Sequence, residues 1–280
     1  MALGERTSSA QPFSLDSRIM RITYIGHATL LIELADRIFL TDPNFDPALG
    51  RFLPRISAPG IAVGSLPRID AIVVTHAHAD HLSFKSLDAL EQDILILAPP
   101  AVAKWLQRRG YRMVQALAAG ESVQSGGVEI RAGAATHQGS RYMVDRWRGA
   151  ANMYLFETKQ LSCFFAGDTA LTPDSTSLVE QHLTLADRRL DIALLPIGHA
   201  PWWKPGFRKG HLTSRDALTL FDRLDARYLI PYHWGTFNHV TSKAHDAINH
   251  LRAHLPEHPR SEMVQILEPG MSFEPPALDQ

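Results

Sequence analysis

The sequence THAHADHLS, at residues 75–83, places three histidines and one aspartate within six positions. These four side chains are His76, His78, Asp80 and His81. They directly follow DAIVVT, residues 70–75, which has the composition of a buried strand. Alternate side chains of extended backbone point the same way, so the first three are expected on one side, and the fourth turns away as a helix begins. Such a density of imidazole and carboxylate groups is typical of divalent transition-metal sites. One tetrahedral ion does not need four ligands from one segment, so two neighbouring ions are predicted.

Short apolar runs alternate with helical patterns on both sides of this segment. Strands are predicted at residues 21–26, 29–34, 37–42, 70–75, 93–99, 151–158, 161–168, 191–198, 226–232 and 264–270, with a hairpin at 121–136. Helices are predicted at residues 83–92, 100–110, 176–190, 214–225 and 243–255, and an irregular loop at 43–67. Strands interleaved with helices predict an α/β fold in which helices cover the sheets.

Further histidines and aspartates follow other predicted strands. They are Asp42 after RIFLT, His137 after EIRAGAAT, Asp168 after SCFFAG and His233 after YLIPY. Strand ends converge on one edge of an open α/β sheet, where such folds place their sites. We therefore expect these groups near the 75–83 segment. Asp42 is interpreted as a hydrogen-bond partner of a ligand or of the adjacent backbone rather than as a ligand.

The composition is that of a folded, nearly neutral chain. Its 280 residues are 45% hydrophobic and 20% charged, with a formal net charge of -1. The charge balance gives no reason to expect nucleic acid as a partner. A single cysteine, Cys163, excludes an intrachain disulfide and a cysteine-based zinc site, and its apolar strand predicts a small buried side chain. Residues 1–17 are expected to be a flexible leader without signal-peptide character, followed by one domain at 18–280, in a cytoplasmic protein.

Seven motifs occur in an order that resembles a known family. They are GHATLLIEL (26–34), FLTDPNF (39–45), LPRIDAIVVTHAHADHL (66–82), THQGSR (136–141), FFAGDT (164–169), LLPIG (194–198) and HWGTF (233–237). HAHADH with the later His, GDT and final His resembles the metallo-β-lactamase superfamily. The finer match is to the N-acyl-phosphatidylethanolamine-hydrolysing phospholipase D family and its bacterial relatives, over roughly residues 22–237. The resemblance implies the four-layer αββα sandwich of that superfamily.

The resemblance also implies a ligand set for two divalent ions. One ion would be held by His76, His78 and His137. The other would be held by Asp80, His81 and His233, with Asp168 bridging the two. Zinc is the expected metal, although iron and manganese suit the same donors. His211 matches a family histidine that lines the site near the leaving group.

A hydrolytic mechanism follows from these charges. Two close ions lower the pKa of a bridging water, so that hydroxide forms near neutral pH and attacks a phosphorus or carbonyl centre. Asp80 or Asp168 is expected to orient that water or accept its proton. His211 is expected to donate a proton to the leaving group or a hydrogen bond to it.

Other groups are expected near the site, each with an alternative role. His27 is expected beside the metals or their ligands, the alternative being a histidine of the turn between two strands. His199 is assigned to substrate contact or to polar packing. One loop contains aromatic and basic side chains that are expected either to form a lip over the site or to pack as an ordinary loop. A lip of this kind would suit an acyl chain and its phosphate. The residues are Trp202, Trp203, Lys204, Phe207, Arg208 and Lys209.

Three functions are compatible with the sequence. The leading one is a metal-dependent phosphodiesterase, either phospholipase D-like or acting on a smaller phosphodiester. The second is a lactonase or other carboxylic ester hydrolase of the same superfamily, and the third is a non-catalytic metal-binding scaffold. The expected partner is a small-molecule or lipid phosphodiester, with peripheral membrane contact and homo-oligomer formation left open.

Overall fold

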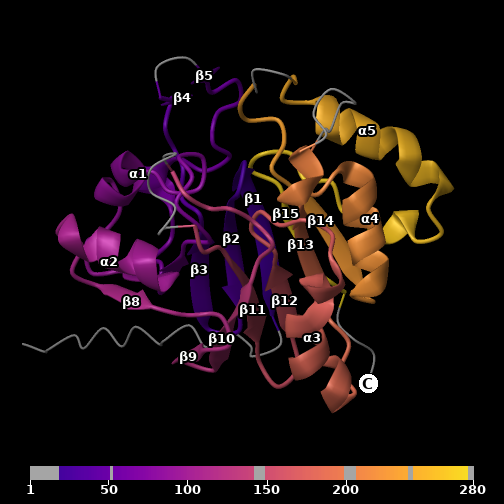
Figure 1. Cartoon of the computed structure of the whole chain (residues 1–280), viewed down its shortest axis with the longest axis horizontal. Helices are drawn as coiled ribbons and strands as arrows, with labels where there is room; N and C mark the ends of the chain where they lie inside the picture. The colour runs from indigo at the N-terminus through magenta and orange to yellow at the C-terminus, as the bar shows by residue number, and fades with distance from the viewer. Residues whose placement is uncertain (1–18, 51–52, 142–148, 199–205, 239–241, 277–280) are drawn as a thin grey trace, which may run out of the picture.

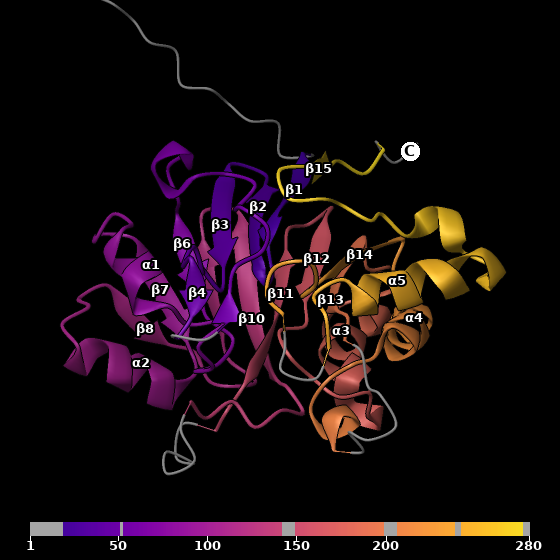
Figure 2. The same cartoon turned by 90° about the horizontal axis from the view of Figure 1, so that it is seen from above.

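Two β-sheets lie face to face between two layers of helices in the computed structural model (Figures 1 and 2). It describes residues 19–50, 53–141, 149–198, 206–238 and 242–276. The predicted four-layer αββα sandwich is confirmed. The expected leader at 1–17 lies outside the described residues, and the extent of the domain, 18–280, stays a prediction.

The first sheet is built by the N-terminal half of the chain and one late strand. Its order is β15-β1-β2-β3-β6-β7-β8. The strands are β1 (Met20–Gly26), β2 (Thr29–Leu34), β3 (Arg37–Thr41), β6 (Ala71–Val73), β7 (Leu95–Ala98), β8 (Val114–Ala116) and β15 (Ser272–Phe273). Strands β1, β2 and β3 are antiparallel neighbours, whereas β3, β6, β7 and β8 run parallel. A separate hairpin joins β4 (Ala48–Leu49) to β5 (Leu53–Pro54).

The second sheet contains the later strands, in the order β14-β13-β12-β11-β10-β9. They are β9 (Ser122–Ser125), β10 (Val128–Ala134), β11 (Asn152–Glu157), β12 (Ser162–Phe165), β13 (Ile192–Pro196) and β14 (Tyr228–Tyr232). Strands β9 to β12 are antiparallel neighbours, and β12, β13 and β14 run parallel. Each sheet therefore has a parallel part, and polar residues that follow the carboxyl ends of its strands lie at one edge of the sheet.

Helices cover the outer faces of the two sheets (Figure 1). Helices α1 (Phe84–Asp88) and α2 (Pro100–Arg108) lie on the first sheet, and α3 (Ser177–His182), α4 (Ser214–Arg223) and α5 (Asp246–His254) on the second. Short 3-10 helices lie at Val63–Ser65, Pro173–Thr176, Thr184–Ala186, Phe207–Lys209, Leu255–Glu257 and Ser261–Met263. None of the described helices is both long and apolar enough to cross a bilayer.

Alternation within β2 shows how the sequence produces the layers. Leu30 and Ile32 belong to the core between the sheets, where Phe39 of β3 and Phe156 of β11 have ring centroids 5.1 Å apart. Leu31 points to the opposite face and joins the core beneath α1 and α2. Both faces of the strand are buried because helices cover the outer one, so the run reads as almost continuously apolar.

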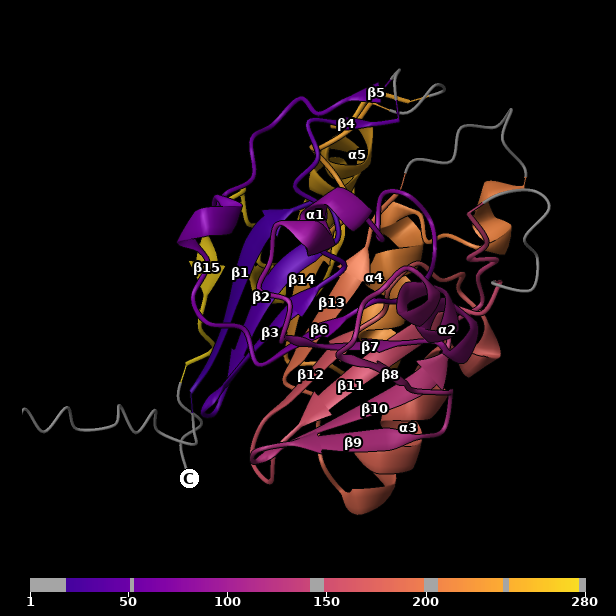
Figure 3. The same ribbon diagram turned by 90° about the vertical axis from the view of Figure 1, so that its left-hand side faces the viewer.

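The carboxyl ends of the parallel strands meet at one edge of the sandwich. There β6 leads to His76, β12 to Asp168 and β14 to His233. The β1–β2 turn reaches the same edge, because β1 and β3 are both antiparallel to β2. The β4–β5 hairpin and α5 lie at this end of the molecule (Figure 3).

Three element predictions are wrong in detail. The strand predicted at 264–270 contributes only a bridge from Val264 to Leu229, because the chain turns at Gly270, and the pairing with β1 begins at Ser272. The helix predicted at 176–190 ends at His182, where Leu183 enters the core and a 3-10 turn follows. The helix predicted at 83–92 ends at Asp88.

Candidate metal centre

The seven side chains predicted as ligands lie together at the carboxyl edge, although they come from distant parts of the chain. They form two groups of potential donors, with one histidine, His27, added to the predicted set. The groups are His76, His78, His137 and Asp168, and His27, Asp80, His81 and His233. Within each group, one donor atom per residue lies within 4.8 Å of the others. Each group thus has the size needed to surround one ion.

The first group contains three imidazoles whose free nitrogens face one another. His137 Nε2 lies 3.2 Å from His78 Nδ1, and the His76 ring centroid is 4.6 Å from each of the other two. His137 Nδ1 donates a hydrogen bond to the carbonyl of Gly210 at 2.7 Å, which leaves Nε2 with its lone pair. The rings of His76, His78 and His137 therefore surround one position that an ion could occupy.

The second group is equally compact. His81 Nε2 lies 3.3 Å from His233 Nε2, and Asp80 Oδ2 lies 3.7 Å from the first atom and 3.6 Å from the second. Ligands about 2.0–2.1 Å from a tetrahedral zinc ion are separated from one another by about 3.3 Å. The observed spacings are close to that value.

Asp168 lies between the two groups. Its Oδ2 atom is 3.4 Å from His81 Nε2, and its Oδ1 atom is 3.5 Å from His233 Nε2, while the residue also belongs to the first group. It follows Gly167, whose φ of +58° belongs to the left-handed region. A Cβ at Gly167 would lie 2.7 Å from Thr75 Cγ2, so this tight turn requires glycine. The turn aims the carboxylate at both groups.

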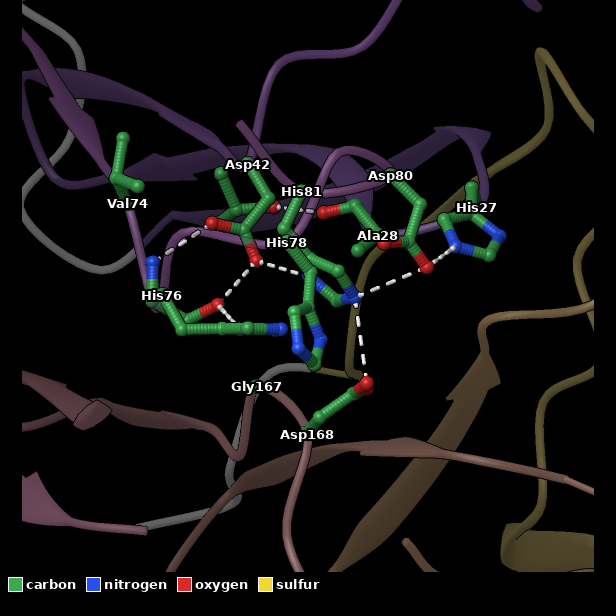
Figure 4. Close-up of polar contacts among 12 residues, drawn as sticks. His27, Ala28, Asp42, Val74, His76, His78, Asp80, His81, Gly167 and Asp168 are labelled. Atoms are coloured by element: carbon green, nitrogen blue, oxygen red, sulfur yellow. Dashed lines mark hydrogen bonds and ion pairs between the residues drawn. The ribbon is translucent and has the colours of Figure 1, made fainter. Parts of the chain in front are cut away.

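Asp42 holds histidines of both groups without belonging to either, as Figure 4 shows. Its Oδ2 accepts a hydrogen bond from His81 Nδ1 at 2.8 Å and another from Thr75 Oγ1 at 2.6 Å. Because the Thr75 hydroxyl donates to Asp42, it accepts from His76 Nδ1, 2.9 Å away. Oδ1 of Asp42 accepts from the backbone N–H of Thr75 at 2.7 Å. Each imidazole is thereby fixed with Nε2 directed at the centre, the arrangement that raises the basicity of metal-binding histidines.

Burial and charge set the protonation of these groups. Burial lowers the pKa of His137 to about 4 and holds that of His76 well below its usual range. Burial would raise the pKa of Asp168, but the nearby His233 and His81 outweigh it and keep that pKa well below the usual range. Burial would lower the pKa of His81, but the Asp168, Asp80 and Asp42 carboxylates hold it well above the usual range.

Two buried atoms at the centre show that the residues fit a metal. Among the described residues, His76 Nε2 and Asp168 Oδ1 have no hydrogen-bond partner, although both are shielded from solvent. A buried polar atom without a partner costs free energy, roughly 1–3 kcal/mol, and a coordinated cation removes that cost. Nitrogen and carboxylate donors at these spacings match the preferences of zinc and of other borderline divalent ions.

His211 faces the centre from the loop before α4. Its Nδ1 atom donates to the carbonyl of Phe207 at 3.2 Å, and its ring stacks on that of Phe207 at 4.7 Å. Its Nε2 atom lies 3.5 Å from Asp168 Oδ2, and one third of the side chain is exposed. His211 can therefore reach both the centre and a bound substrate.

An apolar pocket adjoins the second group. It has a volume of about 120 Å³ and begins at His27, Asp80 and His233. Its other walls are formed mainly by apolar side chains, with a few polar groups among them: Leu49, Leu53, Ile197, Gly198, Phe207, Phe237, Asn238, Ser242, Lys243, Ala244 and Ala247. Ligand pockets usually occupy roughly 300–1,000 Å³, so this one accommodates a substituent rather than a whole substrate.

Parts of the predicted lip and one predicted contact lie outside the described residues. These are His199, Trp202, Trp203 and Lys204. Arg208, by contrast, lies among the described residues, where it forms an ion pair with Asp216 at the start of α4. Cys163 lies on β12 and is fully buried, as the sequence predicted.

Comparisons with known proteins agree with this geometry. A family model described as "Beta-lactamase superfamily domain" matches residues 37–234, well over half of the chain. An N-acyl-phosphatidylethanolamine-hydrolyzing phospholipase D 1 from Caenorhabditis elegans is 30% identical over 239 residues, which cover 77% of this chain and 64% of that protein. This chain thus spans less than two thirds of that relative.

Two further relatives cover most of both chains. A UPF0173 metal-dependent hydrolase from Anoxybacillus flavithermus is 28% identical over 222 residues, 78% of this chain and 87% of the relative. The crystal structure of "a possible metal-dependent hydrolase" from Veillonella parvula has a TM-score of 0.73 at 19% identity, covering 91% of this chain and 99% of that one. At that identity the solved structure supports the fold alone. With the family model spanning every predicted ligand from His76 to His233, the chain belongs to the metallo-β-lactamase superfamily.

Proposed function

We propose that this protein is a metal-dependent hydrolase of the phosphodiesterase type, with two divalent ions, zinc foremost, in the centre. Superfamily membership and the relatives support the general part of this function, a metal-dependent hydrolase of the metallo-β-lactamase superfamily. The phosphodiester specificity is supported by the similarity to a phospholipase D at 30% identity. The observation that carries the proposal is the position of Asp168 between two compact donor groups.

The proposed roles follow from the contacts of each side chain. His76, His78 and His137 would hold one ion, Asp80, His81 and His233 the other, and Asp168 both. Ions held there would polarise an oxygen of the substrate and lower the pKa of a bound water to about 7. Asp42 keeps the ring nitrogens directed at the centre through its bonds to His81 and Thr75.

Proton transfer is assigned to groups that touch the reacting atoms. Asp80 or Asp168 would take up the proton of the attacking water, because both remain ionised at neutral pH and lie at the centre. His211 Nε2, 3.5 Å from Asp168 Oδ2, would receive that proton and pass it to the departing oxygen, while Nδ1 keeps its own hydrogen on the Phe207 carbonyl. Asp80 or Asp168 would thus act as the general base and His211 as the general acid.

The pocket supports a substrate with an apolar substituent and a negative charge. Leu49, Leu53 and Phe237 supply apolar contact beside the second group, and Lys243 is a cation in the same lining. A phosphodiester carries one negative charge and two ester substituents, so it satisfies both features. Small-molecule and lipid phosphodiesters share this chemistry, and a lipid substrate would bring the protein to a membrane surface.

The experiment is a substrate panel with metal content measured on the same sample. The purified protein, loaded with zinc, is assayed with bis(p-nitrophenyl) phosphate, with alkyl phosphodiesters and with a series of lactones and carboxylic esters. Hydrolysis of phosphodiesters is the expected result. Turnover of lactones without phosphodiesters would replace the proposal by the ester hydrolase alternative, and full metal occupancy with no turnover of either class would favour a metal-binding scaffold.

A further inference from the structure

His27 lies in the β1–β2 turn beside the second donor group. The residue is 6% exposed, and its φ of 56° is in the left-handed region, which is uncommon for residues with a side chain. Strained backbone of this kind persists when surrounding contacts hold it, and it concentrates at functional sites. His233, whose ring centroid lies 4.0 Å from that of His27, also has a left-handed φ, of 72°.

One contact of His27 is with the carboxylate of Asp80. His27 Nε2 lies 3.1 Å from Asp80 Oδ2, as the dashed line in Figure 4 marks. An ionised carboxylate only accepts, so Nε2 carries the hydrogen and donates it. The same Oδ2 atom faces His81 Nε2 and His233 Nε2. The bond therefore fixes the oxygen that completes the second group.

His27 also contacts His233 through its backbone and its ring. The carbonyl oxygen of His27 accepts a hydrogen bond from the backbone N–H of His233 at 3.0 Å. The two rings pack with centroids 4.0 Å apart, and Phe237 packs edge-on against His27 at 5.3 Å. One residue thus positions both the carboxylate and one imidazole of the same group.

Four donors are available for the second ion without His27. Asp80, His81 and His233 lie 3.3–3.7 Å apart, and Asp168 lies 3.4 and 3.5 Å from the two imidazoles. These distances are close to the roughly 3.3 Å between ligands of a tetrahedral zinc ion. With Nε2 committed to Asp80, the imidazole acts through its neighbours rather than as a ligand.

We propose that His27 is a positioning residue that holds Asp80 and His233 for the second ion and leaves the first ion unaffected. The inference rests on the two-ion centre of the proposed function. It assigns a difference between the two ions: removing the hydrogen bond from His27 weakens only the ion held by Asp80, His81 and His233. Outer hydrogen-bond partners of metal ligands typically change affinity by about 10–100-fold.

The test is a matched pair of substitutions in the full chain, His27→Gln and His27→Leu. The two side chains have similar volume, and both residues must adopt the same left-handed backbone. Only glutamine has an N–H near the position of Nε2. Zinc-loaded protein is titrated with a chelator, and the ions released and retained are counted at each free zinc concentration. We expect His27→Leu to release one ion about 10–100-fold more readily than wild type and to retain the other at wild-type affinity. His27→Gln should retain both ions within a few-fold of wild type.

Each other outcome overturns the proposal. Equal loss of one ion from both variants would mean that the imidazole itself binds the ion, because an amide is a poor ligand for zinc. Wild-type retention of both ions in His27→Leu would mean that His27 only packs in the turn. Weaker binding of both ions in His27→Leu would show that His27 does not act on the second ion alone. If His27→Leu does not fold, as judged by circular dichroism, loss of an ion from His27→Gln still overturns the positioning role. Failure of the wild-type protein to hold two ions would instead overturn the proposed function.

Discussion

His211 is placed to move a proton without serving as a ligand in either donor group. We expect His211→Gln to lower kcat about 10²–10⁴-fold for phosphodiesters with alkoxide leaving groups, the usual contribution of a general acid. The p-nitrophenolate leaving group needs no proton, so turnover of bis(p-nitrophenyl) phosphate should fall much less. Paired kcat measurements with zinc content determined for each sample check this. An equal loss for both leaving groups, or a loss of zinc, would contradict the role.

His81 carries the pH dependence of metal binding. Burial alone would lower the pKa of His81, but Asp168, Asp80 and Asp42 hold it well above its usual range, so His81 is protonated at pH 7 in the metal-free protein. A metal requires the deprotonated ring, so binding must release that proton and weaken as pH falls. Calorimetric titration of zinc in buffers of different ionisation enthalpy should detect release of about one proton at pH 7. Zinc binding with no proton release would contradict the raised pKa.

At the scale of elements, the turns that follow the strands create the centre. We expect Gly167→Ala, directly after β12, to destabilise the protein by about 1–3 kcal/mol, because the left-handed φ and the contact with Thr75 both oppose a Cβ. Zinc affinity should fall with it, since Asp168 is the next residue. Gly127→Ala is the control, because a Cβ there meets nothing within 4 Å and the backbone is not left-handed. Urea denaturation compares the two, and equal stability would contradict the account of this turn.

The strand exits could be predicted from sequence because two local signals coincide there. An apolar run followed at once by His or Asp identifies the end of a buried strand, and this rule located His76, Asp168 and His233. The role of Asp42 could also be predicted, since the structure bonds it to His81 and Thr75 rather than placing it in a donor group. Polar residues at buried strand ends are informative because burial is costly without partners.

Other elements lacked such a signal. Strand β8 (Val114–Ala116) is short and largely exposed, so no apolar periodicity marks it. The apolar run at 264–270 resembled a strand, yet its neighbours in the fold leave only the bridge at Val264. The contact of His27 with Asp80 depends on the register of β1 and β2 and on the position of the loop after β6, which one sequence does not encode locally. Long-range packing decides these details.

At the scale of the whole molecule, the centre joins the two sheets. His76 follows β6 of the first sheet, whereas Asp168 and His233 follow β12 and β14 of the second. Bound ions would therefore link the sheets, and a ligand that binds only the folded state stabilises it by about 4.1 kcal/mol at a thousand times its Kd. We expect chelation to lower the Tm by at least about 5 °C, given about 2–4 °C per kcal/mol for chains near this size. An unchanged Tm after complete removal of metal, with refilling as the control, would contradict that link.

In the proposed centre, two donor groups that share Asp168 hold two ions. The most direct measurement is the number of transition-metal ions per chain, by elemental analysis of zinc-loaded, dialysed protein, with Asp168→Asn as the comparison. We predict close to two ions per chain for the wild-type protein and one or fewer for Asp168→Asn, because a neutral amide bridges two cations poorly. One ion or none in the wild-type protein, or two in Asp168→Asn, would contradict the claim.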